Sequence, residues 1–344
     1  MWKKALESKY RFYTMSLALL VTVCVVRWWA RGHPEVFLRV YTDGINRWMI
    51  QGVSRFSGLF HVSLFEVLLL SLLITGGRIM VQERWRGVLK CAGSLVFIYS
   101  AFMLMWGLNY ERPSIATDFA LEMQPLSTSD LKTLYLQLIE LANVTRAEVS
   151  ESEAGIFLAN QRQVEAGFEA IEKHYGRFGG EFGSYKTVVT SDVLSRARIA
   201  GVYGMFTGEP NVNAQLPDVA RLFTVAHESA HQRGVAHEDE TNFVAFMACT
   251  LHPEADYRYA GYFNALVYAR EALMDTGEID WVVSHDALID QGVARDFNDV
   301  FRFWQEREGV LDGIVNWGSD LFLNFHNTGE YVGIVDFLYA YFDL

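Results

Sequence analysis

Residues 227–242 read HESAHQRGVAHEDETN, and they constrain the fold more than any other stretch of the chain. The first of these residues fall on a helix expected from about Asp218 to Arg233, where His227 and His231 project from one face, one turn apart. At this spacing both imidazoles can bind one Zn²⁺, and Glu228 can take a proton from a water molecule at the metal and pass it to a leaving amine. The pattern predicts metal-assisted hydrolysis, and the alternative is a pair of structural histidines beside an exposed glutamate.

Three residues that follow the second histidine are candidates for a third metal ligand. Read as HExxHxxGxxH, the stretch ends at His237 and matches the metzincin pattern. Glu238 and Asn242 instead have the gluzincin spacing, a glutamate ligand followed one helical turn later by a side chain that can orient a ligand histidine. Glu240 is a nearby rival. Because Met247 lies inside the next expected helix and makes no methionine turn, Glu238 is the favoured ligand.

The first third of the chain differs in charge and polarity from the rest. Residues 1–110 contain 13 Lys and Arg against 5 Asp and Glu, a net charge of +8, which leaves −20 for residues 111–344 out of the total of −12. The acidic part would repel phosphates, which argues against a nucleic-acid partner. Three apolar segments, at about 12–29, 56–77 and 91–108, predict a membrane anchor with three transmembrane helices.

The first apolar segment could also be read as a signal peptide. The bulky sequence Arg27-Trp28-Trp29 stands where a cleavage site needs small residues, so an anchor is the better interpretation. The basic N-terminus and the Arg-rich loop at 78–90 favour the cytoplasmic side, although arginines at 31–47 weaken this bias. Three crossings would place the acidic C-terminal part outside the cytoplasm.

One ionisable residue, Glu66, falls within the second expected span. A charged group in hydrocarbon is costly, so such a residue is a functional candidate. The simpler interpretation, which we favour, is that Glu66 is protonated, or bonded to His61 or to a backbone group inside the helix bundle.

Residues 111–344 have the pattern of a mainly helical α+β domain that is large enough to bury a full core. Ser127 and Asp130 are placed to cap the first helix. The expected elements are helices at about 127–143 and 151–175, a strand at 185–190, short strands within 200–216, helices at about 218–233, 239–251, 255–274 and 290–308, and a last apolar helix. Cys24, Cys91 and Cys249 form no spaced metal or disulfide pattern.

Two further features bear on chemistry. The segment 206–213, FTGEPNVN, precedes the expected metal helix, and it is either an edge strand that pairs with an extended substrate or a turn that packs under the helix. Hydrolysis also needs a donor for the developing oxyanion. Tyr203, His285, His326 and Tyr331 are the candidates, and the sequence does not choose among them.

The strings WGLNYERP (106–113), FTGEPNVN (206–213), HESAHQRG (227–234) and EDETNF (238–243) resemble a bacterial family catalogued as domain of unknown function 3810. Its members look like membrane-anchored zinc peptidases with an HExxH domain and a following E-D-E-A-N run. The position of His237 is not reliably histidine in that family, which supports a glutamate ligand. This chain departs from the family in having Thr241 where alanine is favoured.

Together these observations predict a bacterial cell-membrane protein, in which a multi-span anchor carries an extracytoplasmic zincin-like domain of the gluzincin type. His227, His231 and Glu238 would bind Zn²⁺, and Glu228 would be the general base for hydrolysis of a peptide or protein substrate. One alternative is a zinc-binding sensor or scaffold that holds a peptide at the membrane without cutting it. Another is a membrane structural protein with a chance motif.

Overall fold

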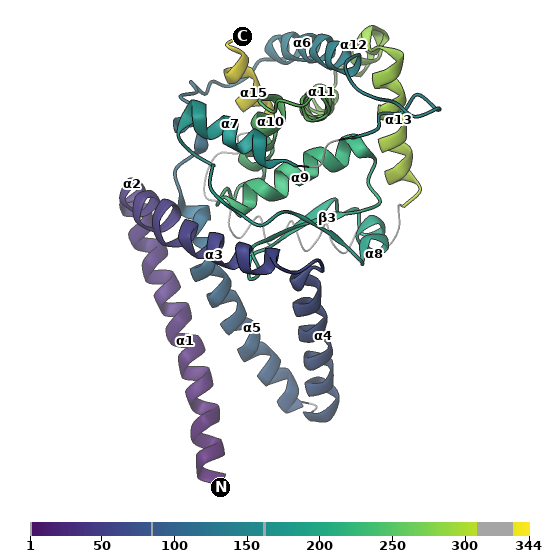
Figure 1. Cartoon of the computed structure of the whole chain (residues 1–344). Coiled ribbons are helices and arrows are strands. Elements are labelled where there is room, and N and C mark those ends of the chain that lie inside the picture. The colour runs from purple at the N-terminus through teal and green to yellow at the C-terminus, as the bar shows by residue number, and fades with distance from the viewer. Residues whose placement is uncertain (1, 84, 161–162, 308–332) are drawn as a thin grey trace. The chain divides into compact units, whose positions relative to one another are not determined.

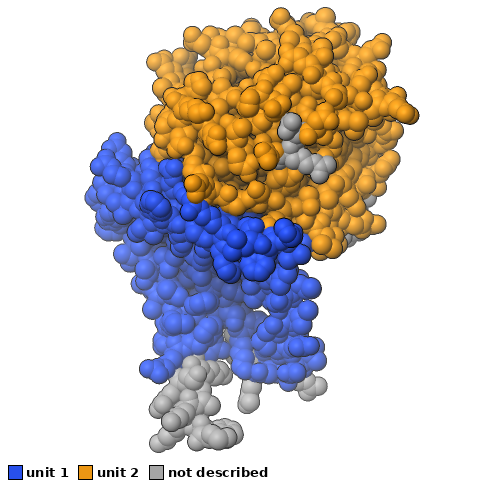
Figure 2. Space-filling view, in the orientation of Figure 1, with its two compact units in different colours: residues 1–113, 204–209 blue, residues 114–203, 210–344 orange. Residues whose placement is uncertain are grey.

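The computed structural model describes residues 2–83, 85–160, 163–307 and 333–344 (Figure 1). The chain divides into two compact units, one made of residues 1–113 and 204–209 and the other of residues 114–203 and 210–344 (Figure 2). Most of the described residues are helical, and the strands among them form one small sheet.

The first unit consists of helices. They are α1 (Trp2–Gly32), α2 (Pro34–Phe37), the π-helix η1 (Leu38–Asn46), α3 (Arg47–Gly58), α4 (Leu64–Glu83), α5 (Trp85–Met105) and the 3₁₀ helix η2 (Gly107–Glu111). Among the described residues, two stretches are long and apolar enough to cross a membrane, Arg11–Gly32 and Leu64–Glu83, and their side chains are almost entirely unburied. The apolar stretch of α5, Lys90–Met105, is shorter. By length and composition, therefore, only two of the three predicted spans qualify.

The second predicted span, 56–77, is displaced in the structure. Helix α3 ends at Gly58 and α4 begins at Leu64, although the sequence between them stays apolar. The Glu209 carboxylate accepts hydrogen bonds from the backbone N–H groups of Leu64 (3.2 Å) and Phe65 (2.8 Å), which are two of the four donors that a helix start leaves unsatisfied. This distant carboxylate sets the start of α4, and a local reading of the apolar run could not anticipate it.

The position of Glu66 changes as a result. It lies in the first turn of α4 rather than in the middle of a span, and its backbone N–H donates to Ser63 Oγ (3.1 Å). A carboxylate is favoured near a helix N-terminus by the helix dipole. His61 lies in the exposed segment between α3 and α4. The structure therefore explains Glu66 as a first-turn residue and leaves no need for a role inside the membrane.

The string WGLNYERP holds the first unit together. The Glu111 side chain, 2% exposed, forms ion pairs with Arg27 (2.5 Å) and Arg31 (2.8 Å) of α1. Asn109 Nδ2 donates to Asn46 Oδ1 (3.0 Å) at the end of η1. The polar residues of this string thus tie the end of α5 to α1 and η1.

The second unit packs helices over a three-stranded sheet. Its elements are the 3₁₀ helix η3 (Ile115–Thr117), α6 (Thr128–Arg146), α7 (Glu165–Tyr175), β1 (Lys186–Val188), α8 (Ser191–Arg196), β2 (Gly201–Gly204), β3 (Glu209–Asn213), α9 (Asp218–Gln232), α10 (Glu238–Thr250), α11 (Ala255–Asp275), α12 (Ile279–His285), η4 (Asp286–Leu288), α13 (Gln291–Gln305) and α15 (Ile334–Phe342). The strand order is β1-β3-β2, and β1 runs parallel to β3. Helix α9 lies between the sheet and the pair α10 and α11 (Figure 1).

The predicted helix at 151–175 is wrong over its first half. Helix α7 begins at Glu165, and Glu151 instead pairs with Phe157 in an isolated bridge. Gly155, in the left-handed region at φ +71°, turns the chain between them. The buried Asp296 of α13 accepts the Phe157 N–H (2.8 Å), so a distant partner satisfies backbone that a helix would otherwise have used. By contrast, the predicted helix cap within residues 127–130 is confirmed, and the structure shows it as a capping box between Ser127 and Asp130 at the start of α6.

Candidate metal centre

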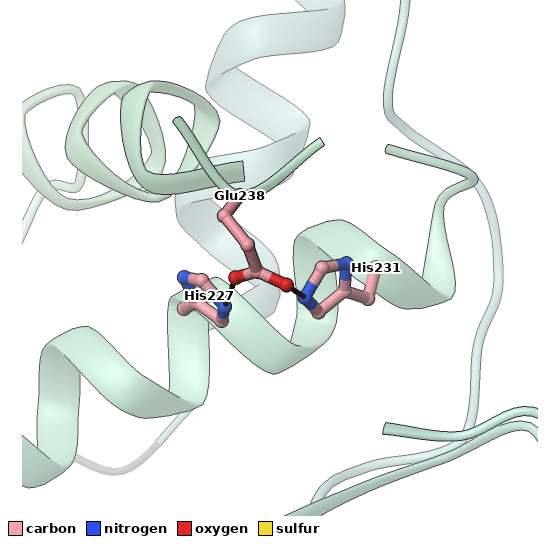
Figure 3. Close-up of side chains that lie close together, drawn as sticks. All are labelled: His227, His231 and Glu238. Atoms are coloured by element: carbon pink, nitrogen blue, oxygen red, sulfur yellow. Dashed lines mark ion pairs between the residues drawn. The ribbon is translucent and has the colours of Figure 1, made fainter. Parts of the chain in front are cut away.

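A tight turn between α9 and α10 brings the candidate ligands together. Helix α9 ends at Gln232, and Gly234 adopts φ +83°, a backbone conformation that favours glycine. The chain then reverses, and α10 begins at Glu238. The first side chain of α10 is thereby directed at the face of α9 that carries His227 and His231 (Figure 3).

The three side chains meet through their terminal atoms. Glu238 Oε2 lies 3.3 Å from His227 Nε2, and Glu238 Oε1 lies 3.7 Å from His231 Nε2. All three candidate ligand atoms lie within 4.8 Å of one another. The two imidazole rings are nearly perpendicular, with centroids 4.8 Å apart, so that each presents Nε2 to the carboxylate. Because Glu238 is about half exposed, the cluster is open to solvent on that side.

The other nitrogen of each imidazole is held by an oxygen acceptor. His227 Nδ1 lies 2.8 Å from Asn242 Oδ1, and His231 Nδ1 lies 2.8 Å from the carbonyl oxygen of Val235. Tyr268 Oη–H of α11 also donates to Asn242 Oδ1 (3.1 Å) and fixes that side chain. Since these oxygens can only accept, Nδ1 carries the proton in both rings, and Nε2 is the nitrogen that can bind a metal.

Charges at the cluster favour a shared proton in the metal-free chain. Burial alone would lower the pKa of His227, but the carboxylates of Glu238 and Glu228 raise it to about 9. Burial lowers the pKa of His231 to about 4, so this ring is neutral at pH 7. Burial raises the pKa of Glu238, but the two imidazoles more than offset this and lower it to about 2. At neutral pH the proton between His227 and Glu238 is therefore the one that a metal ion would displace.

Glu228 lies beside the cluster but does not join it. It is 4% exposed, and its Oε2 has no hydrogen-bond partner among the described residues. Burial raises its pKa to about 8. Strand β2 approaches so closely that a Cβ added to Gly201 would stand 2.6 Å from Glu228 Oε1, so a larger residue there would force the Glu228 side chain to shift. The site thus holds a buried carboxylate whose pKa lies near neutrality and whose second oxygen is open for a proton.

The two rival third ligands point elsewhere. Glu240 is buried, and its Oε1 accepts the backbone N–H of Ile115 (3.1 Å). His237 is the N-cap residue of α10 and is not part of the three-residue cluster. Of the three alternatives that the sequence left open, Glu238 is the one that the structure brings to both histidines. The Thr241 hydroxyl donates to the His237 carbonyl oxygen (2.7 Å).

The candidate oxyanion donors are separated by the fold. Tyr203, on β2, stacks beside His231 with ring centroids 6.4 Å apart. His285 stacks on Trp281 within α12, at 3.9 Å. His326 and Tyr331 lie outside the described residues. Tyr203 is therefore the described candidate that reaches the cluster.

The edge-strand prediction for 206–213 is wrong. Its strand residues form β3, and β3 lies between β1 and β2, so both of its sides are already paired. The rest of the segment is the turn before β3, where Gly208 adopts φ +63°. The strand at the sheet edge beside Glu228 is β2. Strand β2 falls within the short strands expected at 200–216; its position at the sheet edge beside a buried carboxylate was not predicted.

A cavity of about 720 Å³ adjoins the cluster within the second unit. His227, Glu228 and Glu238 lie on its wall, together with residues of α11 and α13. The sequence analysis assigned no role to α13. The one available signal was the apolar spacing of Phe297, Val300, Phe301 and Trp304.

Comparison with known proteins gives one relationship. No curated protein matches the chain, and no solved structure matches it. A family model matches residues 41–339, which include the end of η1, the cluster on α9 and α10, and most of α15. The chain belongs to the family described as protein of unknown function (DUF3810).

Proposed function

We propose that this chain is a membrane-anchored zinc metallopeptidase whose second unit is a zincin-like domain of the gluzincin type. The observation that carries the proposal is the pair of His227 and His231, each held at Nδ1 and each facing Glu238 through Nε2, beside the buried carboxylate of Glu228. Two neutral imidazoles and one carboxylate make a ligand set of catalytic zinc sites, which keep a fourth position open.

The distances fit a zinc ion. In a tetrahedral site with bonds of about 2.0–2.2 Å, neighbouring ligand atoms lie roughly 3.3–3.6 Å apart. The Nε2–Oε separations of 3.3 and 3.7 Å are close to this range. The Nδ1–H groups donate to Asn242 Oδ1 and to the Val235 carbonyl oxygen, and these hydrogen bonds hold the rings in orientation. The three ligand atoms lie within 4.8 Å of one another, so the cluster would have to contract when the ion binds.

Glu228 would be the general base. A bound zinc ion polarises a substrate carbonyl and makes a nearby water molecule more acidic. Glu228 accepts the proton of that water molecule through its unpartnered oxygen and then passes it to the leaving amine. The outer edge of β2 supplies backbone groups that can pair with an extended peptide, and Tyr203 is placed to donate to the developing oxyanion.

The anchor and the orientation belong to the same proposal. The two apolar stretches Arg11–Gly32 and Leu64–Glu83 would cross a bacterial cell membrane, together with the shorter one in α5. The basic N-terminus would be cytoplasmic, and the catalytic unit would act on peptides or proteins outside the cytoplasm.

The test uses the full chain purified in detergent. We expect one zinc per chain in the wild type and in Glu228→Gln, and loss of zinc in His227→Ala and Glu238→Ala. Glu240→Gln is the matched control, because that buried glutamate faces Ile115 rather than the cluster. Peptide-library cleavage should fall by ~10²–10⁴-fold in Glu228→Gln. A wild type that takes up no zinc would refute the proposal, and zinc binding without any cleavage would favour a non-catalytic peptide sensor or scaffold.

A further inference from the structure

The cavity beside the metal cluster has two walls of different chemistry. One wall holds the polar groups of the cluster, including Glu228 and Glu238. Much of the remaining lining comes from α11 and from one face of α13. The cavity volume of about 720 Å³ lies within the range of roughly 300–1,000 Å³ that is usual for ligand sites. Such a cavity is large enough for a stretch of peptide and not merely for a water molecule at the metal.

The α13 face is apolar along its whole length. Phe297, Val300, Phe301 and Trp304 follow one another at helical spacing and all line the cavity. Phe297 rests on Phe263 of α11, with ring centroids 4.7 Å apart, so this end of the wall is anchored to the core. Phe301 is 65% exposed. A single exposed apolar side chain is ordinary, but four that share one cavity next to a candidate active site form a binding wall.

The charged groups of the cavity disfavour an acidic occupant beside the cluster. The lining holds the glutamates Glu228, Glu238 and Glu271 and the arginines Arg198 and Arg270, of which Arg270 is paired with Asp286 (2.8 Å). An acidic side chain beside Glu238 would meet a like charge, whereas an apolar side chain would cover the exposed part of the α13 face.

The backbone on the near side fits the same occupant. Residues 198–201 line the cavity and lead into β2, the edge strand. The Ala200 carbonyl accepts the Asn213 N–H (2.9 Å), so Ala200 faces β3, and by strand alternation Gly201 faces the open side. A peptide paired there would lie beside Glu228 and direct alternate side chains to the α13 wall.

We propose that the α13 face formed by Phe297, Val300, Phe301 and Trp304 binds a bulky apolar side chain of the peptide substrate next to the scissile bond. This inference rests on the proposed peptidase function and adds the substrate class to it. The preferred substrate carries Phe, Leu or Met at one position flanking the cleaved bond. It does not carry Asp or Glu there.

The experiment compares decapeptides of Ala, Ser and Gly in which a single position carries Phe, Ala or Asp. Cleavage by the full chain is measured for the wild type, Phe301→Ala, Phe301→Leu and the control Asn298→Ala, which changes an exposed residue of the same helix outside the cavity. Phe301 is exposed, so its replacement should leave folding and zinc content unchanged. We expect Phe301→Ala to lower kcat/KM for the Phe peptide about tenfold, with little effect on the Ala peptide. Phe301→Leu should restore most of the loss.

A second readout separates this inference from the peptidase proposal. Binding of the same peptides to the full-length Glu228→Gln protein is followed by fluorescence anisotropy. Tighter binding of the Phe peptide than of the Asp peptide, weakened by Phe301→Ala, would support the apolar site even if no peptide is cut. Cleavage that depends on Glu228 but shows equal rates for Phe and Asp peptides would overturn the apolar site and leave the peptidase proposal standing. Equal binding of the two peptides would overturn it as well.

Discussion

Replacement of Asn242 by alanine tests the metal centre through a residue that is not itself a ligand. The change removes the hydrogen-bond acceptor of His227 Nδ1, an oxygen 2.8 Å away that fixes both the tautomer and the ring orientation. Loss of such a partner typically weakens metal affinity ~10–100-fold, or about 1.4–2.8 kcal/mol. We expect a loss near the upper end of this range, because the same oxygen also accepts a hydrogen bond from Tyr268 (3.1 Å). Without Asn242, the Tyr268 hydroxyl loses that acceptor as well.

The assay is a zinc titration of the full chain at pH 7 against a chromophoric chelator. Asn242→Asp serves as the conservative variant, because a carboxylate also accepts from Nδ1–H and raises the basicity of the ring, so affinity should stay within a few-fold of wild type. Asn143→Ala is the matched control, since Asn143 makes two comparable hydrogen bonds, to Leu288 and Asp290, away from the cluster. Wild-type zinc affinity in Asn242→Ala would show that the imidazole orientation does not depend on this contact.

Three further outcomes follow from the same contacts. First, the pKa of Glu228 is raised from an ordinary 4.5 to about 8 in the metal-free fold. Protonation of Glu228 therefore stabilises the folded state relative to the unfolded state. Its contribution is complete below about pH 4.5 and is lost as the pH rises to 8. Urea unfolding of the metal-free protein should therefore show a steeper loss of stability over this window in the wild type than in Glu228→Gln. Second, Gly201→Ala should cost roughly 1–3 kcal/mol and lower cleavage, because the added Cβ would stand 2.6 Å from Glu228 Oε1; an unchanged melting temperature and rate would contradict the close packing. Third, Asp296→Ala should destabilise the second unit by about 3 kcal/mol, since it removes the buried carboxylate closest to Arg146 (2.7 Å) and leaves that guanidinium with the more exposed Glu151 (3.3 Å); calorimetry would detect the change.

The parts of the site that depend on local geometry were accessible from the sequence. His227 and His231 share a face because any helix places residues four apart together. Gly234 marked the turn, and Asn242 stands one helical turn after Glu238. The choice among Glu238, Glu240 and His237 needed the direction in which α10 leaves that turn, which no spacing rule supplies.

The parts that failed depend on contacts between residues far apart in the chain. Helix α4 begins at Leu64 because Glu209, 145 residues away, accepts its N–H groups. Over residues 151–160 the expected helix is replaced by irregular backbone, because Asp296 accepts from Phe157. In each case a buried carboxylate outcompetes a local preference, since unsatisfied backbone donors in the interior cost more than helix propensity provides.

The strongest argument against a chance motif is the environment of Glu228 rather than the presence of the histidines. Histidines paired with a carboxylate can be purely structural, and the buried Glu240 also has an oxygen without a hydrogen bond among the described residues, but Glu240 binds the Ile115 N–H, whereas Glu228 lines the cavity beside the two histidines. Such a carboxylate lowers the stability of the fold at neutral pH, and the close approach of Gly201 restricts the space around it. Glutamine or leucine would fill a structural position at less cost. Glu228 has a pKa near neutrality and lines the cavity beside two oriented imidazoles. These properties suit a group that takes a proton from water and passes it to the leaving amine of a bound peptide.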